Sequence, residues 1–421
     1  MPNMDESTPS TTCETSLRFD ECTAELINRG FLTQERWIEL VNGDLVTARE
    51  TVLSLIDDQL KQAVQLALSK QPTDQVLHSD IIAAAAGGLW GAASAWLKTT
   101  PILNPLPAPV RTTSLQAATS APRSSQFLWD TAKEAALRSM ETSRKIRTVD
   151  FLEVKRYCGD ALTCDHVVIA INGFMTHGYK PSVNWEAIGR KRSVSGFVLL
   201  WEAGNAAEWD VFCNETSVHL ETGQDDTIAS HFTVGNPWNK AQNKAHQVGI
   251  VLAELLISQP VLLRGRKVTL VGHSLGSAVI HSCLQHLAAY NSNSNNTPIH
   301  LHQAVFFAAA FVPDHDFSTI AETVFQPNAA IPNRMLNVFS SQDHILMHLF
   351  SLVNMHIARP AAGCAAIKSN HVRNIDVSDI IPSTHESILG HSYEKFMDAI
   401  VDRLGTTLDL PYATVDPQAG E

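Results

Sequence analysis

The sequence has little positive charge and does not gather it. Its 421 residues include 31 Lys and Arg against 43 Asp and Glu, which gives a formal net charge of −12 at pH 7. Nucleic acids select proteins with clustered Lys and Arg, because these side chains neutralise the phosphate backbone. The sequence contains no basic stripe, so we expect no nucleic acid partner. An apolar fraction of 44% is typical of a chain that is globular for most of its length.

Paired cysteines are also missing. The cysteines are odd in number, widely spaced and without a CxxC pair: Cys13, Cys22, Cys158, Cys164, Cys213, Cys283 and Cys364. This spacing predicts neither a disulfide framework nor a zinc cluster, and it fits a reducing compartment. The first residues, MPNMDESTPSTTCETS, are polar and acidic, whereas a secretory signal needs a basic start and an apolar run. We therefore expect a cytoplasmic location.

The common cofactor motifs do not occur either. The sequence has no Walker loop and no GxGxxG turn. His344 and His348 have the helical spacing that can bind zinc, but the glutamate of HExxH is absent and no third ligand is evident. We expect no cofactor and no metal.

Changes in composition divide the chain into segments. Residues 1–14 are Ser/Thr-rich and acidic, which predicts a disordered tail. Apolar residues at spacings of three and four make residues 15–98 a helical N-terminal region, with a break at Asn42-Gly43-Asp44. Residues 99–126 are rich in Pro, Ser and Thr and predict a linker. The main folded domain is expected over residues 127–410, followed by a tail at 411–421.

The N-terminal region contains one uncharged, Ala/Gly-rich run, IIAAAAGGLWGAASAWL, at residues 81–97. Its length lies at the lower edge of a membrane span, and its small residues make it only weakly hydrophobic. We favour a helix that is buried or lies at an interface over a spanning helix, because no second clear span follows. A peripheral membrane contact through residues 81–97 remains an alternative.

Apolar runs alternate with helical patterns from residue 127 onward. The pattern predicts strands at residues 152–157, 166–171, 197–201, 267–271, 305–309 and 336–339, and helices at 127–147, 241–257, 277–290 and 393–404. Such alternation predicts a mainly parallel sheet with helices on both faces. The predicted fold class is α/β.

One stretch, VTLVGHSLGSAVI at residues 268–280, joins a β-branched strand to a helix through Gly272-His273-Ser274-Leu275-Gly276. This is the G-x-S-x-G nucleophile elbow in the strand–turn–helix context that it requires. A nucleophile at the tip of a tight turn crowds the positions two before and two after it, so both must lack a Cβ. Ser274 is the predicted nucleophile.

A serine nucleophile needs a base and an acid, which follow it in α/β hydrolases in the order Ser, Asp or Glu, His. Asp343 ends a loop after a predicted strand, at the sheet edge where ligands bind. Asp314 and Asp316 are alternative acids. His391 lies in a loop just before the last predicted helix and is the expected base, with His385 as the alternative.

The oxyanion hole of this fold takes one backbone amide from the residue after the nucleophile and another from a loop after an earlier strand. Leu275 fills the first position. The second loop is INGFMTHG, which follows the apolar run VVIAI and contains glycines that permit close backbone approach. Gly173 and Phe174 are its expected donors.

Several segments carry a family likeness: VVIAINGF, LLWE from Leu199, NPWNKAQNKAHQVGIVLAELL from Asn236, RKVTLVGHSLGSAVIHSCLQHLA from Arg266, LNVFSSQDHIL from Leu336, and VRNIDVSD followed by GHSYEKFM. Over residues 130–405 they resemble the α/β-hydrolase family of the transmembrane and coiled-coil domain type, a little-characterised eukaryotic group to which serine hydrolase chemistry is ascribed. The resemblance implies catalytic roles for Ser274, Asp343 and His391, and a membrane-embedded Gly/Ala-rich segment after a helical N-terminal region. Residues 81–97 are shorter than such a segment.

These observations predict a serine hydrolase that cleaves a carboxylic ester, of a lipid or of another acyl chain, through an acyl-enzyme on Ser274. Thioester or amide cleavage would use the same triad. The expected partner is a small-molecule or lipid ester substrate, and no protein partner is indicated. The alternative is a non-catalytic scaffold or membrane-trafficking adaptor that retains the hydrolase fold, because a fold does not fix a function.

Overall fold

The computed structural model describes residues 12–71, 148–176, 180–208, 237–313, 317–325, 334–350, 359–384 and 387–413. The chain divides into two compact units. The first consists of Met1–Gln71, Val149–Val211 and Lys244–Glu421, and the second of Pro72–Thr148 and Phe212–Asn243. The predicted apolar run 81–97, the linker 99–126 and the predicted helix 127–147 lie outside the described residues.

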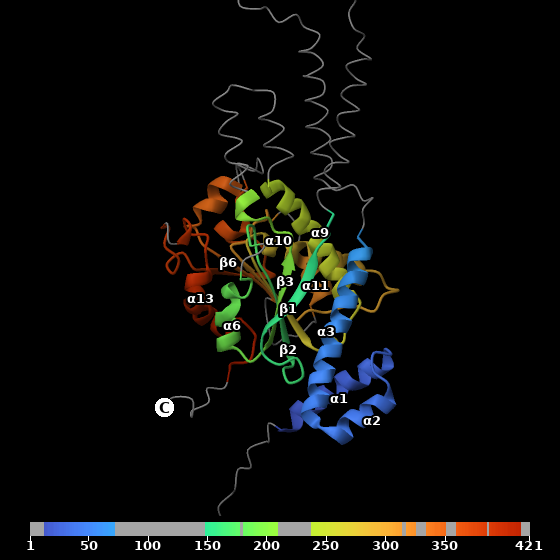
Figure 1. Cartoon of the computed structure of the whole chain (residues 1–421). Coiled ribbons are helices and arrows are strands. Elements are labelled where there is room, and N and C mark those ends of the chain that lie inside the picture. The colour runs from blue at the N-terminus through green and yellow to red at the C-terminus, as the bar shows by residue number, and fades with distance from the viewer. Residues whose placement is uncertain are drawn as a thin grey trace, which may run out of the picture. The chain divides into compact units, whose positions relative to one another are not determined.

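The first unit is built on a sheet with the strand order β1-β3-β2-β4-β5-β6-β7 (Figure 1). The strands are β1 Leu152–Cys158, β2 His166–Ile171, β3 Ser195–Trp201, β4 Lys267–His273, β5 Gln303–Phe307, β6 Met335–Phe339 and β7 Val372–Asp376. Only β1 runs antiparallel to its neighbour, and all other pairs are parallel. The central strands are almost entirely buried, as parallel strands between two helical layers must be. The predicted α/β class is confirmed.

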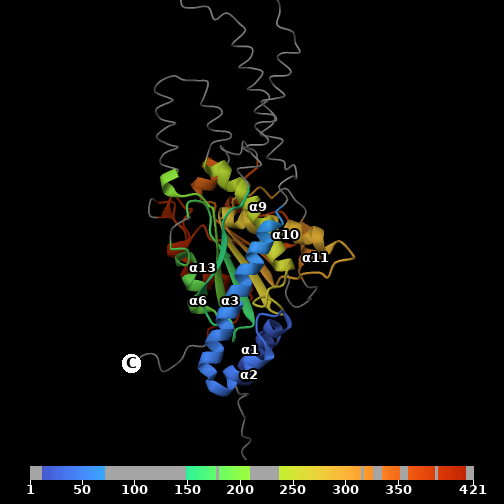
Figure 2. The same ribbon diagram turned by 45° about the vertical axis from the view of Figure 1, so that its right-hand side comes forward.

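Helices cover both faces of this sheet. Their bounds are α6 Glu186–Lys191, α9 Pro237–Ile257, α10 Leu275–Asn291, α11 Phe317–Val324 and α13 Met397–Leu404. Helices α6 and α13 lie on one side and α10 and α11 on the other, in Figure 1 and again in Figure 2. Helix α9 packs tightly on α10 at Gly249, where an added Cβ would lie 2.5 Å from Cβ of Ser282. None of the described helices combines the length and apolar character that crossing a bilayer requires.

The predicted helical N-terminal region is present as α1 Thr12–Asn28, α2 Gln34–Gly43 and α3 Leu45–Ser69. The break between α2 and α3 falls at Asp44, whose carboxylate accepts the amides of Val46 at 3.3 Å and Thr47 at 2.9 Å. Such N-caps satisfy amides that have no acceptor within the helix. Helix α3 packs on β1, and Oε1 of its Gln59 accepts the amide of Val261 at 2.9 Å. The N-terminal helices therefore belong to the same unit as the sheet.

Strands β5 and β7 differ most from the sequence pattern. Strand β7 is not evident in the sequence, because it lies at the edge of the sheet and buries only Val372 of its five residues. Strand β5 ends at Phe307, two residues before the end of the apolar run, because Ala308 adopts a left-handed backbone with φ 44°. Burial of an apolar run therefore does not by itself mark where a strand ends.

Candidate active site

Ser274 occupies a tight turn between β4 and α10. Its φ of 56° and ψ of −121° lie in a strained region for a residue with a Cβ. A Cβ on Gly272 would lie 2.6 Å from the carbonyl carbon of Gly276, and a Cβ on Gly276 would lie 2.1 Å from the carbonyl oxygen of Ile171. Both positions therefore require glycine.

Hydrogen bonds to the last residue of β5 and to the segment just after it hold this turn in place. The amide of Ser274 donates to the carbonyl of Phe307 at 2.9 Å, and the amide of Ala310 donates to the carbonyl of Ser274 at 3.2 Å. Oγ of Ser277 donates to the carbonyl of Gly272 at 2.7 Å and to that of Phe307 at 3.1 Å. Strained backbone persists only where its surroundings fix it, and here the neighbouring strand does so.

The side chains of Ser274, His391 and Asp343 meet in one hydrogen-bonded row. Nε2 of His391 lies 3.0 Å from Oγ of Ser274, and its Nδ1 lies 2.8 Å from Oδ2 of Asp343. A carboxylate only accepts, so Nδ1 carries the proton and Nε2 is left to accept from the serine hydroxyl. Asp343 is fully buried, and its Oδ1 accepts the amide of Leu346 at 2.9 Å. The same carboxylate therefore orients the imidazole and caps the helical turn Ile345–Phe350.

The loop that carries His391 has an unusual backbone. Ile388, Leu389 and Gly390 have successive positive φ values of 48°, 55° and 88°. A Cβ on Gly390 would lie 2.1 Å from the carbonyl oxygen of Gln342, so the loop lies directly against the segment that carries the acid. The amide of His344 donates to the carbonyl of Leu389 at 3.0 Å, which links the two segments.

The predicted oxyanion loop touches Ser274. A Cβ on Gly173 would lie 2.6 Å from Cβ of Ser274, so the close approach depends on this glycine. Leu275 is the first residue of α10, and amides in this position have no acceptor inside their helix. The amide of Met175 is used elsewhere, because it donates to the carbonyl of Ala203 at 3.0 Å. The structure thus brings Gly173 beside Ser274, and Leu275 follows Ser274 directly in the chain. The ring of Phe174, the next residue of the loop, lies against Gly204.

Asn172 supports this loop, a role that the sequence pattern does not predict. Its side chain is buried, donates from Nδ2 to the carbonyl of Pro181 at 2.8 Å, and accepts at Oδ1 from Nε1 of Trp185 at 2.8 Å and Nδ2 of Asn184 at 3.0 Å. Nε1 of Trp201 donates to its carbonyl at 3.0 Å. The only signal in the sequence is an amide residue directly after a buried apolar strand.

Cys364 lies next to Asp343. Its Sγ lies 3.7 Å from the carbonyl oxygen of Asp343. Burial, together with the charge of Asp343, raises the pKa of the Cys364 thiol to about 12. A nucleophilic thiolate is therefore disfavoured here, because the thiolate is the reactive form of cysteine.

Asp314, Asp316 and His385 lie outside the described residues. Within the described parts of the chain, no three His, Cys, Asp or Glu side chains are grouped closely enough to hold a metal ion.

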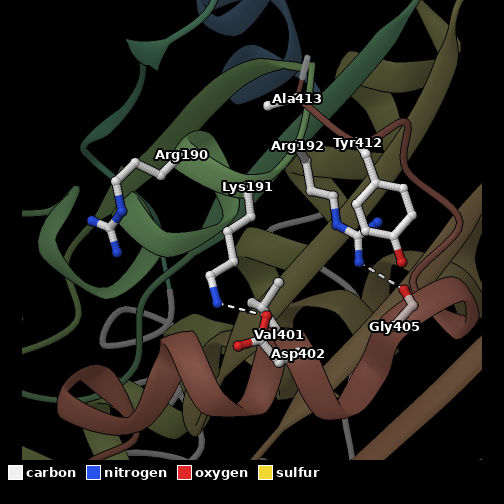
Figure 3. A pocket seen from close by; sticks show the side chains of 8 residues that line it. All are labelled: Arg190, Lys191, Arg192, Val401, Asp402, Gly405, Tyr412 and Ala413. Atoms are coloured by element: carbon white, nitrogen blue, oxygen red, sulfur yellow. Dashed lines mark hydrogen bonds and ion pairs between the residues drawn. The ribbon is translucent and has the colours of Figure 1, made fainter. Parts of the chain in front are cut away.

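A pocket of about 430 Å³ lies apart from these residues, between the end of α6 and α13 (Figure 3). Its cations are engaged within the protein: Nζ of Lys191 lies 2.6 Å from a carboxylate oxygen of Asp402, and Arg192 donates to the carbonyl of Gly405 at 2.7 Å. The ring of Tyr412 stacks on the Arg192 guanidinium, with 3.9 Å between the guanidinium carbon and the ring centroid. None of Ser274, Asp343 and His391 lines this pocket, so it is not a substrate pocket for them.

The strand order, the turn at Ser274 between β4 and α10, and the order of serine, aspartate and histidine along the chain define an α/β-hydrolase fold. Residues 228–407 match the model of the DUF726 family, which is described as a protein of unknown function. The family resemblance that the sequence indicates is confirmed.

Two curated relatives illustrate this likeness. The transmembrane and coiled-coil domain-containing protein STS1 of Oryza sativa subsp. japonica is 32% identical over 164 residues, which is 38% of this chain and 22% of that protein. The probable lipase MIL1 of Saccharomyces cerevisiae is 29% identical over 177 residues, which is 41% of this chain and 14% of that protein. The matches thus span less than a quarter of the length of these relatives.

Among solved structures, an esterase from the Planctomycetes species Thermogutta terrifontis with bound propionate aligns over 62% of this chain and 90% of its own, at 10% identity and a TM-score of 0.31. The fold of the present protein is defined by the strand order of its own sheet.

Proposed function

We propose that this protein is a serine hydrolase that cleaves carboxylic esters through an acyl-enzyme on Ser274. The observation that carries the proposal is the pair of contacts made by His391, at 3.0 Å to the hydroxyl of Ser274 and 2.8 Å to the carboxylate of Asp343. Nucleophilic catalysis by serine needs a base within this reach and an acid that holds the tautomer of the base. A relative named as a probable lipase supports the same class of chemistry.

The reaction proceeds in two halves. Oγ of Ser274 attacks the ester carbonyl while Nε2 of His391 takes the hydroxyl proton, and the buried Asp343 stabilises the imidazolium that forms. The ester bond breaks, and His391 returns the proton to the departing alcohol. A water, activated by the same histidine, then hydrolyses the acyl-enzyme and releases the carboxylic acid.

The amide of Leu275 and an amide of Gly173 or Phe174 serve as oxyanion donors in this proposal. Leu275 begins α10, so the positive end of the helix dipole also favours the developing negative charge. The close contact of Gly173 with Ser274 supports its place in the hole.

The surroundings of the site favour an apolar acyl chain. Four large apolar side chains on the loops of Gly173, Asp343 and His391 are exposed: Ile388 by 58%, Met175 by 41%, Leu389 by 39% and Met347 by 37%. Exposed apolar groups near a polar centre are typical of a surface that binds apolar ligands. We therefore infer a substrate whose acid part is a hydrocarbon chain, as in a lipid ester or a small acyl ester.

Hydrolysis of p-nitrophenyl esters of increasing acyl length tests the proposal. The expected result is a burst of p-nitrophenol that approaches one equivalent per protein molecule, followed by slower turnover, with both phases absent in Ser274→Ala. Longer acyl chains should give a higher kcat/KM than acetate. Well-folded protein that gives neither a burst nor turnover with any ester would contradict the proposal and favour the non-catalytic scaffold or trafficking adaptor.

Contact with membranes is a separate part of the proposal. One relative is named as a transmembrane protein, and residues 81–97 are the apolar run in this sequence that could mediate a peripheral contact. Liposome flotation of the full chain and of a chain without residues 81–97 measures this contact. Loss of flotation in the shortened chain is expected, and equal flotation of both would reject the role of this run.

A further inference from the structure

The residue next to Ser274 contacts the main chain of the base. His273 is the last residue of β4, and its Nε2 lies 2.9 Å from the carbonyl oxygen of His391. A carbonyl only accepts, so Nε2 of His273 carries the proton and donates it. The strand that delivers Ser274 is thus bonded directly to the loop that delivers His391.

The environment of His273 keeps its ring neutral near pH 7. Its ring centroid lies 5.1 Å from that of His391 and 5.4 Å from that of Tyr393. Desolvation, with a further contribution from the nearby His391, lowers the pKa of His273 to about 3. The ring is therefore neutral near pH 7. Since its Nε2 faces the His391 carbonyl rather than Oγ of Ser274, His273 does not act as a second base.

The main chain before His391 needs external support. Ile388 and Leu389 bear side chains and yet adopt left-handed backbone, which costs roughly 1 kcal/mol or more for each residue. On one side the loop is held to the acid segment, where the carbonyl of Leu389 accepts the amide of His344 at 3.0 Å. On the other side it is held to the turn of Ser274 through the His273 side chain. The segment that carries His391 is therefore hydrogen-bonded both to the segment of Asp343 and to the turn of Ser274.

We propose that His273 is a positioning residue, whose Nε2–H holds the main chain of His391 so that the imidazole stays in reach of both Ser274 and Asp343. This inference rests on the proposed esterase function. In this proposal His273 contacts neither the substrate nor the reacting atoms. Its substitution should therefore lower the rate of the chemical step and leave substrate binding unchanged.

Two substitutions separate the hydrogen bond from the packing of the ring. His273→Phe keeps an aromatic ring against His391 and Tyr393 but removes the donor. His273→Gln loses the ring but places an amide nitrogen about as far along the side chain as Nε2, so it can donate to the same carbonyl. We expect His273→Phe to lower kcat about tenfold with KM unchanged. His273→Gln should recover kcat to within about threefold of the natural enzyme.

Burst kinetics show whether each variant is slower or only less abundant in active form. A burst amplitude close to that of the natural enzyme, with a reduced rate constant, is expected for His273→Phe. A reduced amplitude at an unchanged rate constant would mean a loss of folded protein and would overturn the positioning role. Equal rate constants in His273→Phe and His273→Gln would overturn it as well, because the donor would then be irrelevant.

Proton NMR gives a readout that does not depend on turnover. The Nδ1–H of His391 in its bond to Asp343 should give a low-field resonance, assigned by its absence in His391→Gln. We expect this resonance to shift or broaden in His273→Phe and to return in His273→Gln. An unchanged resonance in His273→Phe would overturn the inference. A natural enzyme that shows no burst would contradict the proposed function instead, and the NMR comparison would still decide whether His273 positions His391.

Discussion

Nδ1 of His391 lies 2.8 Å from Oδ2 of Asp343, while the second oxygen of the same carboxylate accepts the amide of Leu346 at 2.9 Å. Both oxygens of this buried group are therefore engaged, and its orientation is fixed from two sides. The imidazole of His391 has a rigid partner before any substrate arrives, which is the preorganisation that proton transfer in a triad needs.

Asp343→Asn tests this dependence. Asparagine has one acceptor oxygen in place of two, so the amide of Leu346 and the imidazole compete for it, and the imidazole can be held in the wrong tautomer. We expect kcat for ester hydrolysis to fall by about 10³- to 10⁴-fold. Asp379→Asn is the control, because Asp379 is an exposed carboxylate paired with Arg403 at 2.7 Å on the surface. A loss of less than tenfold in Asp343→Asn would contradict the proposed role of the carboxylate.

Gly173→Ala tests the close approach of the oxyanion loop. The added methyl would lie 2.6 Å from Cβ of Ser274, so the loop has to move away from the serine. We expect kcat to fall by about 10²-fold or more, while far-UV circular dichroism is retained. Gly43→Ala is the matched control, because a Cβ at Gly43 meets no atom within 4 Å. Equal activity of the two variants would contradict the placement of Gly173.

Asn172→Ala tests the support of that loop. The substitution leaves the indole N–H of Trp185 and the carbonyl of Pro181 without their partner, and unsatisfied buried groups cost about 1–3 kcal/mol. Urea denaturation should show a corresponding loss in the free energy of unfolding, together with reduced kcat. The exposed Asn295 provides the control substitution to alanine. Unchanged stability of Asn172→Ala would show that the network is not maintained in solution.

His166 should make folding stability depend on pH. Burial, with a smaller effect of the neighbouring His302, lowers the pKa of His166 to about 4. Its ring centroid lies 5.0 Å from that of His302. The ordinary pKa of histidine is about 6.5, so between pH 6.5 and 4 the unfolded chain binds a proton at this position that the folded chain does not. The contribution of His166 to stability is complete above pH 6.5 and is lost as the pH falls through this window.

The test is the free energy of unfolding measured between pH 7.5 and about 4. The natural protein should lose stability on acidification, and His166→Gln should lose less over the same range. A substitution of the exposed Asn295 to alanine is the control and should leave the slope unchanged, because it removes no titratable group. A slope in His166→Gln equal to that of the natural protein would contradict the account.

Much of the fold could be predicted from the sequence because its central strands are buried on both faces. Unbroken apolar runs such as VVIAI mark β2 and β3, and the glycines around Ser274 mark the turn after β4. Edge strand β7 could not be recognised, because its mostly exposed residues follow no hydrophobic pattern. Asp343 and His391 could be proposed from chain order, and the structure places His391 beside Ser274 and Asp343 beside His391.

Contacts between loops that are distant in the chain could not be predicted from the sequence. The bond from His273 to the His391 carbonyl joins residues 118 positions apart, and the Asn172 network joins the oxyanion loop to Trp185 and Trp201. Such contacts depend on the three-dimensional path of loops with no sequence periodicity. A single histidine or asparagine gives no signal of them, because both residue types occur on many surfaces for other reasons.

The central claim is that Ser274 is the nucleophile, and labelling by a fluorophosphonate probe tests it most directly. The account predicts one covalent adduct per molecule, located by mass spectrometry on the peptide that contains Ser274. Labelling should be absent in Ser274→Ala and unchanged in Ser292→Ala, a substitution of an exposed serine at the end of α10. Folded natural protein that takes up no probe, or equal labelling of Ser274→Ala, would contradict the account.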